Sequence, residues 1–259
     1  MSTPGDDPTI DGEYTPLPLA QRLRDAAATR GTRAVAGDFA RWGIRLVAGL
    51  PHAGGEHGTF TLAGEDHAYC YGAYKRAWVT ERAVEVPIAQ QLVDETRAAG
   101  GRVLEVGHVL GHYRPGQDHV VVDKYESAEG VLNRDVMDLE PLGVFDLVIA
   151  VSTVEHVGWD EEPRVPGLAV EAITALRRSV APGGRLVLTI PVGYNPSLDD
   201  AVRQGALPWS SLRALRREPG TTDWHEVDPT AALTAPYDFL LYSARAVLVA
   251  ELPSRSSAS

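Results

Sequence analysis

From residue 80 onward, short apolar runs alternate with stretches of helical periodicity, and this alternation constrains the fold more than any other feature. One helical stretch, VEAITALRRSV, carries apolar residues at helical spacing and is ended by APGG. Interleaved apolar strands and helices form a mainly parallel sheet with helices on both faces. The sequence therefore predicts a doubly wound α/β fold. The apolar runs are VLEV at 103, HVVVD at 119, FDLVIAV at 145, RLVLTIP at 185 and AVLVAEL at 246.

The residues before this region have a different pattern. Residues 17–50 favour two short helices, and PHAGGEHG at 51–58 interrupts them with proline and glycine. TFTL and HAYCY then alternate around a turn at Gly64 to Asp66, which predicts a hairpin. A helix is expected over 80–98. We therefore expect four parts: a disordered tail (1–16), a helical and hairpin extension that forms a lid (17–79), the main domain (80–253) and a second disordered tail (254–259).

Composition excludes several classes of function. The chain has 259 residues with 35 acidic and 24 basic side chains, and this balance disfavours a nucleic-acid partner. LRALRREP at 212–219 is the one basic stretch, interpreted as a solvated helix face. No apolar run is long enough for a bilayer and the N-terminus lacks signal-peptide features, so we expect a cytoplasmic protein without a membrane partner. Cys70 is the single cysteine, which excludes an internal disulfide.

A glycine turn follows the run VLEV and indicates a ligand site. Gly107 and Gly111 in VLEVGHVLG let the backbone turn tightly and approach a ligand, although a simple strand-to-helix turn would also use glycine. Asp123 ends the next strand, where a carboxylate can accept hydrogen bonds from both hydroxyls of a ribose. Dinucleotide sites carry glycine where this chain has Val109, which disfavours a nicotinamide oxidoreductase. The pattern predicts a ribose-containing ligand without a pyrophosphate at this turn.

Five segments together resemble the class I S-adenosylmethionine-dependent methyltransferases. They are VLEVGHVLG, VVVDKYE, NRDVMDLEP, FDLVIAVSTVEHVG and LRRSVAPGGRLVLTIP, in the family's order and spacing. The resemblance covers about residues 80–192, and AVLVAEL fits the last strand. It implies a Rossmann-like, mainly parallel seven-stranded sheet and S-adenosyl-L-methionine as cofactor. Val109 departs from the family's E-x-G-x-G-x-G pattern, a change we expect to alter cofactor packing and not to abolish binding.

The resemblance also implies roles for individual residues. The backbone at Gly107 and Gly111 would pass beside the methionine part of the cofactor, and Glu105 would hold its ammonium directly or through water. Asp123 would hold the ribose hydroxyls. Asp135 and the backbone of Val136 would meet the adenine, although Asp135 also suits a loop acid or helix cap. Ser152, with Thr153, would line the pocket beside the sulfonium.

His156 is the candidate general base. Methyl transfer to a neutral hydroxyl requires alignment of the acceptor and removal of its proton, and imidazole has a suitable pKa. His156 follows the fourth strand, although it also suits a capping or packing role there. His108 and His112 have metal-ligand spacing only if their segment is helical, so no metal is expected. The acidic residues 160–162 are interpreted as a solvated loop.

The acceptor site is expected from residues outside the resemblance. Tyr69, Tyr71, Tyr74 and Trp78 suit either a lid over the cofactor or packing of the hairpin. Tyr194 and Asn195 follow the fifth strand at the same sheet edge. We therefore expect an O-methyltransferase for a hydroxyl of a small molecule, a sugar or natural product, with a homodimer possible. The alternatives are a C- or N-methyltransferase and a catalytically silent cofactor-binding module.

Overall fold

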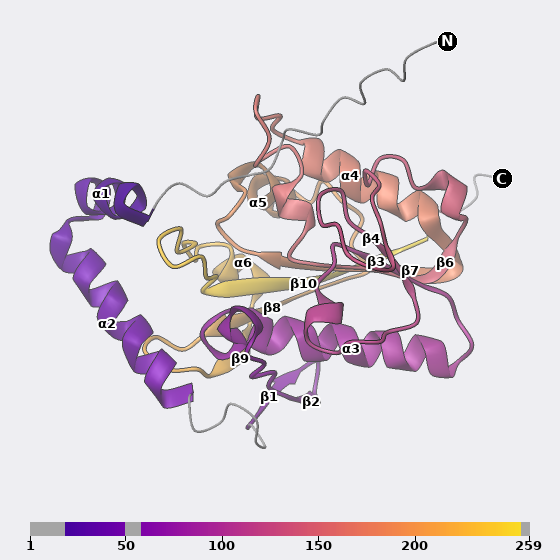
Figure 1. Ribbon diagram of the computed structural model, residues 1–259. Helices are drawn as coiled ribbons and strands as arrows, with labels where there is room; N and C mark the ends of the chain where they lie inside the picture. The colour runs from indigo at the N-terminus through magenta and orange to yellow at the C-terminus, as the bar shows by residue number, and fades with distance from the viewer. Residues whose placement is uncertain (1–18, 50–57, 255–259) are drawn as a thin grey trace, which may run out of the picture.

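The computed structural model describes residues 19–49 and 58–254, and an eight-stranded sheet forms its centre (Figure 1). Across the sheet the strands are β5 (Val131–Leu132), β4 (Val120–Val122), β3 (Val103–Val106), β6 (Phe145–Val151), β7 (Val180–Pro191), β10 (Ala246–Pro253), β8 (Ser211–Arg217) and β9 (Trp224–Val227). The five strands from β5 to β7 pair in parallel, whereas β10 pairs antiparallel with both β7 and β8. The predicted doubly wound, mainly parallel fold is confirmed.

The sheet has one strand more than the seven expected, because β9 pairs antiparallel with β8 at the edge. The prediction of a helix face at 212–219 was also wrong, since residues 211–217 form β8. Leu215 and Arg217 of this strand are buried, while Arg216 between them is exposed. Buried and exposed positions thus alternate as in a strand, but the sequence does not show it because one of the buried residues is an arginine. The Arg217 guanidinium donates to the carbonyls of Val79 and Ala244, each at 2.6 Å.

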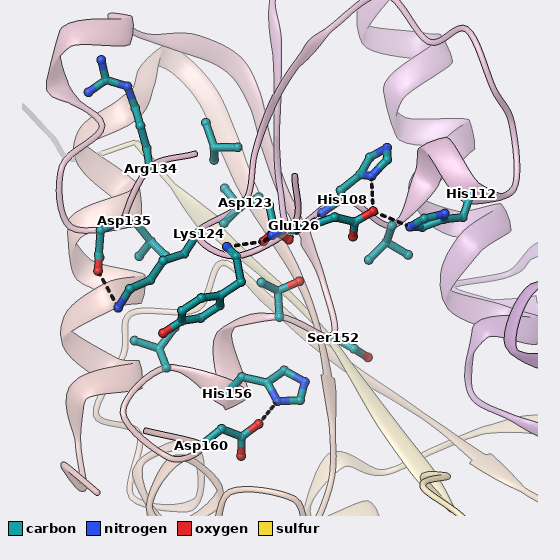
Figure 2. A pocket seen from close by; sticks show the side chains of 18 of the residues that line it. His108, His112, Asp123, Lys124, Glu126, Arg134, Asp135, Ser152, His156 and Asp160 are labelled. Carbon is teal, nitrogen blue, oxygen red and sulfur yellow. Dashed lines mark hydrogen bonds and ion pairs between the residues drawn. The ribbon is translucent and has the colours of Figure 1, made fainter. Parts of the chain in front are cut away.

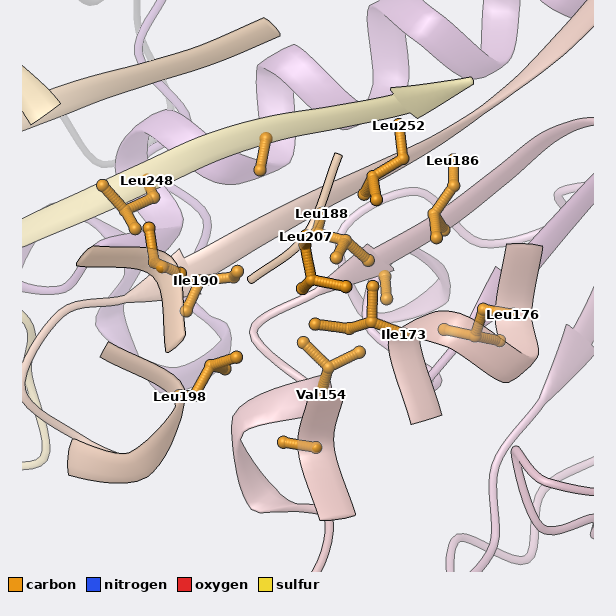
Figure 3. Packing of buried hydrophobic residues seen from close by; sticks show 14 of the residues in the cluster. Val154, Ile173, Leu176, Leu186, Leu188, Ile190, Leu198, Leu207, Leu248 and Leu252 are labelled. Carbon is orange, nitrogen blue, oxygen red and sulfur yellow. The ribbon is translucent and has the colours of Figure 1, made fainter. Parts of the chain in front are cut away.

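Helices cover both faces of the sheet. Strand β6 shows why: Leu147 and Ile149 pack with α3 (Arg82–Ala98), whereas Val148 and Ala150 lie in the cluster that includes α4 (Leu168–Leu176) and α5 (Pro196–Arg203). Alternate residues of a strand point to opposite faces, so one apolar run supplies two cores. Figure 3 shows the α4 and α5 side of this packing. The helix predicted over 80–98 is confirmed as α3.

Two of the short helices lie at the edge where the parallel strands end. The 3-10 helices η3 and η5 follow β3 and β6, the two central parallel strands. The complete set of short helices after α3 is η3 (Leu110–His112), η4 (Glu140–Leu142), η5 (Val154–His156), η6 (Arg177–Ser179) and α6 (Pro229–Ala232).

The extension before α3 forms two helices and a hairpin, as predicted. They are α1 (Leu19–Arg30), α2 (Thr32–Gly49), β1 (Thr59–Leu62) and β2 (Glu65–Ala68), followed by the 3-10 helix η2 (Tyr74–Val79). The hairpin packs against the sheet: Phe60 and Tyr69 share a buried cluster with Trp224, whose backbone N–H donates to the Tyr69 hydroxyl at 2.8 Å. The hairpin thus packs in a buried cluster, and the lid expected over residues 17–79 stays a prediction.

The expected tail at 1–16 lies outside the described residues, as does all of the second tail except Ser254. Within the described ranges, every helix is too short or too polar to span a membrane.

Candidate functional site

A cavity of about 330 Å³ opens at the carboxyl ends of β3, β4 and β6, and we call it the strand-end cavity. Its wall contains both glycine-turn and strand-end residues, among them Gly107, Asp123, Asp135, Ser152 and His156 (Figure 2). Parallel α/β folds bind ligands at this edge, and the volume lies within the range of small-molecule sites. The structure thus brings together most of the residues that the sequence assigned to a cofactor.

Gly107 has a close neighbour that excludes a side chain. Its φ is +84°, and a Cβ added there would lie 2.3 Å from Thr153 Oγ1, so the β3 turn and the end of β6 are in direct contact. The Asp123 carboxylate connects the same turn to the loop after β4. Its Oδ2 accepts from the His108 N–H at 3.1 Å, and its Oδ1 accepts from the N–H groups of Tyr125 and Glu126 at 2.9 and 2.8 Å.

Two predicted cofactor residues, Glu105 and Gly111, are not among the residues that line this cavity. Glu105 is fully buried, and its Oε1 accepts from the backbone N–H groups of Val109 and Leu110 at 2.8 and 2.7 Å. Its Oε2 lies 2.8 Å from His119 Nε2. In this arrangement Glu105 fixes the shape of the glycine turn, and its contact with a cofactor ammonium stays a prediction.

Asp135 and Val136 line the far side of the strand-end cavity. The Asp135 carboxylate is 3.1 Å from Lys124 Nζ, and the same ammonium donates to Glu161 at 2.7 Å. Tyr125 also donates to Glu161, at 2.7 Å. The loops after β4, β5 and β6 are therefore joined by one charged network. Glu161, interpreted from the sequence as part of a solvated loop, is a member of it.

His108, His112 and Glu126 form a group that we call the imidazole–carboxylate cluster. Glu126 Oε1 lies 2.8 Å from His108 Nδ1 and 3.0 Å from His112 Nε2, and Tyr74 stacks on the His112 ring with centroids 4.0 Å apart. The sequence argument placed the two imidazoles apart unless the segment were helical. The 3-10 helix η3 includes His112 but not His108, and the turn before it still brings the two ring centroids to 4.7 Å. These three side chains could hold a metal ion. The ion pairs of Glu126 with the two imidazoles are an equally good account of the same arrangement.

A second cavity of about 360 Å³ lies beside the first, and we call it the aromatic cavity. Trp42 of α2, Arg76 of η2, Tyr194, Tyr237 and Tyr242 are among its lining residues. Four residues line both cavities, namely Lys75, Arg82, Ser152 and His156. A ligand in one cavity would therefore meet a ligand in the other beside these four side chains.

His156 sits in this shared wall and is held by Asp160. Its Nδ1 lies 2.5 Å from Asp160 Oδ2, and the Tyr194 hydroxyl donates to the same carboxylate at 2.7 Å. The His156 side chain is 45% exposed, and the protein around the rest of the ring lowers its pKa by desolvation. The bond to Asp160 and the charges on Glu155 and Asp160 outweigh this, so the pKa is raised. The imidazole is therefore a stronger base than a free histidine, with Nε2 as its other nitrogen.

Glu155 lines the aromatic cavity next to His156. The Glu155 side chain is 1% exposed. The Glu155 backbone N–H and the His156 ring both lie near its carboxyl, but neither forms a hydrogen bond of normal geometry with it. Burial raises the pKa of this carboxyl to about 8. Both carboxyl oxygens of Glu155 are buried, so this group lies behind the surface of the cavity and is not open to a ligand in it.

Arg82 and Glu85 at the start of α3 support the shared wall. Arg82 donates to Glu85 at 2.8 Å and to the Val151 carbonyl at 3.2 Å, and Ser152 donates to Glu85 at 2.5 Å. Glu85 is fully buried. Ser152 has a φ of +42°, a conformation that few non-glycine residues adopt without such anchoring.

The predicted substrate residues divide into two groups. Tyr74 lines the strand-end cavity and Tyr194 lines the aromatic cavity, so both face a ligand site. Trp78 is buried in the hairpin cluster and lines neither cavity, and its contact with an acceptor stays a prediction. Asn195 is also buried: it caps α5 and donates to the Glu155 carbonyl at 2.9 Å. Its side chain thus supports the backbone at Glu155, and its contact with an acceptor stays a prediction.

Sequence reasoning missed Arg82, Glu85 and Asp160. The spacing of His156 and Asp160 in EHVGWD is the i, i+4 spacing of neighbours on a helix, which was available as a signal. Arg82 and Glu85 lie within the region of family resemblance but outside its five quoted segments, and only the packing of α3 on β6 brings them to the site.

No family model and no curated protein matches the chain. Among solved structures, it is similar to the sugar N-methyltransferase KedS8 from Streptoalloteichus sp ATCC 53650, at 19% identity over 62% of this chain and 65% of that one, with a TM-score of 0.34. It is similar to the N-methyltransferase NodS from Bradyrhizobium japonicum WM9, solved with S-adenosyl-L-homocysteine, at 13% identity over 70% and 96% of the two chains, with a TM-score of 0.39.

A possible histamine N-methyltransferase from Thermotoga maritima is similar at 16% identity over 68% of this chain and 93% of that one, with a TM-score of 0.38. The chain spans just under two thirds of the length of KedS8. These structures are methyltransferases, the class that the sequence motifs resemble, and the likeness is partial at these TM-scores.

Proposed function

We propose that this protein is an S-adenosylmethionine-dependent methyltransferase that acts on a small molecule. The strand-end cavity would hold the cofactor and the aromatic cavity would hold the acceptor. The observation that carries this proposal is the shared wall of Lys75, Arg82, Ser152 and His156. An in-line displacement requires donor and acceptor in adjoining sites, and the shared wall supports this arrangement.

The residues of the strand-end cavity fit a nucleoside ligand. Gly107 leaves no room for a side chain beside Thr153, so the backbone itself forms the cavity wall. Asp123 ends β4 at the position expected for the ribose hydroxyls, and its three backbone hydrogen bonds fix its orientation. Asp135 and Val136 would meet the adenine. The cofactor supplies a methyl group on a positively charged sulfur.

The chain's own contribution to the reaction is alignment and proton removal. His156 Nε2 would take the proton from the acceptor, while Asp160 fixes the ring through Nδ1 and stabilises its charged form. The acceptor atom forms a bond to the methyl carbon as the carbon–sulfur bond breaks, and the electron pair stays on sulfur. The sequence predicts a hydroxyl acceptor, and the same base serves a nitrogen acceptor.

His156→Ala tests this assignment. General-base assistance contributes about 10²- to 10⁴-fold in rate, so turnover should fall by that order while affinity for S-adenosylhomocysteine changes only a few-fold. Turnover is measured by mass spectrometry after incubation with labelled S-adenosylmethionine and a panel of small hydroxylated and amino compounds. His225→Ala is the matched control, because this exposed imidazole lines neither cavity. Normal turnover in His156→Ala would remove it from the mechanism.

A further inference from the structure

The acidic and basic side chains that line the aromatic cavity differ in how accessible they are. Both of its acidic residues are buried: Glu81 accepts from the Ala244 N–H at 2.8 Å, and the carboxyl oxygens of Glu155 lie behind the cavity surface. Lys75 and Arg76 of η2 line the same cavity and are exposed to solvent. The charge that a ligand in this cavity can reach is therefore positive.

Lys75 and Arg76 lack a carboxylate partner among the described residues. No ion pair or side-chain hydrogen bond joins either of them to another residue in the part of the chain that the structure describes. The Arg76 guanidinium lies over the Trp42 ring, 5.7 Å from its centroid, and the Lys75 ammonium lies 5.4 Å from the centroid of Tyr74. A guanidinium on an aromatic face keeps the N–H donors at its edge, so Arg76 can still bind an anion by two hydrogen bonds.

The backbone that carries these two cations has an unusual conformation. Lys75 and Arg76 have φ values of +48° and +50°, in the left-handed region that non-glycine residues rarely adopt and that occurs most often at ligand sites. The Arg76 N–H donates to the Ala73 carbonyl at 3.0 Å, which closes the turn. Consecutive side chains of an extended segment point to opposite faces, whereas in this turn both line one cavity.

The Lys75 ammonium also experiences the positive charge of Arg82. The protein around the ammonium lowers the pKa of Lys75 by desolvation, and Arg82 lowers it further, against the opposite effects of Glu126 and Glu81. Both of these carboxylates are engaged elsewhere, Glu126 with two imidazoles and Glu81 with a backbone N–H. An anion bound in the aromatic cavity would offset the repulsion between the cations.

We propose that the methyl acceptor carries an anionic group, a carboxylate or a phosphate, and that Arg76 and Lys75 bind this group. The proposal rests on the proposed methyltransferase function and narrows its substrate class. Arg76 lines the aromatic cavity alone, whereas His156 lies in the wall shared with the strand-end cavity. An acceptor held by its anionic group at Arg76 can therefore direct its other end toward His156 and the cofactor.

Cyclohexanecarboxylate, cyclohexyl phosphate and cyclohexanol are matched probes, because they share one ring and differ in the anionic group. Binding of each to protein loaded with S-adenosylhomocysteine is measured by calorimetry near neutral pH. We expect at least one anion to bind about tenfold or more tightly than the alcohol, as charge-assisted hydrogen bonds predict. The anion that binds more tightly identifies the group that the cavity selects.

Arg76→Gln should remove most of this preference, while its affinity for S-adenosylhomocysteine stays within a few-fold, because Arg76 does not line the strand-end cavity. Arg216→Gln is the matched control and should retain the preference, since this exposed arginine of β8 lines neither cavity. Lys75→Gln should also reduce the preference. If it instead lowers only the affinity for S-adenosylhomocysteine, Lys75 belongs to the cofactor site and its part in the proposal is wrong.

Equal affinity for the anions and the alcohol, no binding of any probe, or a preference that survives in Arg76→Gln would overturn the proposal. Thermal unfolding establishes that each variant is folded, and the melting temperature should not change because the replaced side chains are exposed. Loading with S-adenosylhomocysteine is measured first in the same instrument. Failure at that step contradicts the proposed function, whereas failure at the second step contradicts the anionic acceptor alone.

Discussion

Gly107→Ala tests whether the glycine turn is shaped by contact with the end of β6. Alanine there would meet two costs, one from a φ of +84° and one from a Cβ 2.3 Å from Thr153 Oγ1. Gly116 provides a matched control, since its φ is +80° but nothing lies within 4 Å of an added Cβ. The conformational cost is about 1–2 kcal/mol at either site, and overpacking adds about 1–3 kcal/mol at Gly107 alone.

We therefore expect Gly116→Ala to lower the free energy of unfolding by about 1–2 kcal/mol and Gly107→Ala by about 2–5 kcal/mol, measured by urea denaturation at constant m value. Thr153→Ala should recover part of the loss when combined with Gly107→Ala, because it removes the two atoms closest to the added Cβ. Equal destabilisation by the two glycine variants, or no coupling with Thr153, would refute the reasoning.

Two further predictions concern the chemistry of the site. If His156 is the base, turnover should fall as pH decreases through its raised pKa, so the acid limb of the pH–rate profile lies above the usual histidine pKa. Asp160→Asn should move this limb to lower pH. An unmoved limb would assign the titration to another group. Dialysis against a chelator should leave turnover and melting temperature unchanged, because Glu126 already pairs with both imidazoles of the imidazole–carboxylate cluster. A stoichiometric metal found by elemental analysis would contradict this.

The parallel half of the sheet could be predicted because its strands are continuous apolar runs. FDLVIAV is buried along almost its whole length in β6, and such runs have few alternative folds. Strands β8 and β9 could not be predicted in the same way. β8 carries three arginines, and Arg217 is buried only because carbonyls from η2 and the chain before β10 accept its hydrogen bonds. Those partners are distant in sequence.

The candidate site shows the same division. Asp123 and Gly107 were identifiable because local sequence places them at a strand end and a tight turn. Glu155 and His156 are adjacent in sequence, yet only the packing buries the first side chain and leaves the second in the wall of both cavities. Asn195 follows β7 at the sheet edge, which the sequence indicates, whereas the use of its side chain as a helix cap appears only in the structure. The positions of these residues in the sequence therefore indicate where the candidate site lies. The packing determines which of its side chains a ligand could contact.

Calorimetric titration with S-adenosylhomocysteine, in parallel with NADH, tests the central claim most directly. The account predicts binding of one S-adenosylhomocysteine per chain and no binding of NADH. Asp123→Asn should weaken the affinity roughly ten- to a hundredfold, since charge-assisted hydrogen bonds contribute about 1.5–3 kcal/mol. Absence of binding, a preference for NADH, or unchanged affinity in a folded Asp123→Asn variant would contradict the assignment of the strand-end cavity to this cofactor.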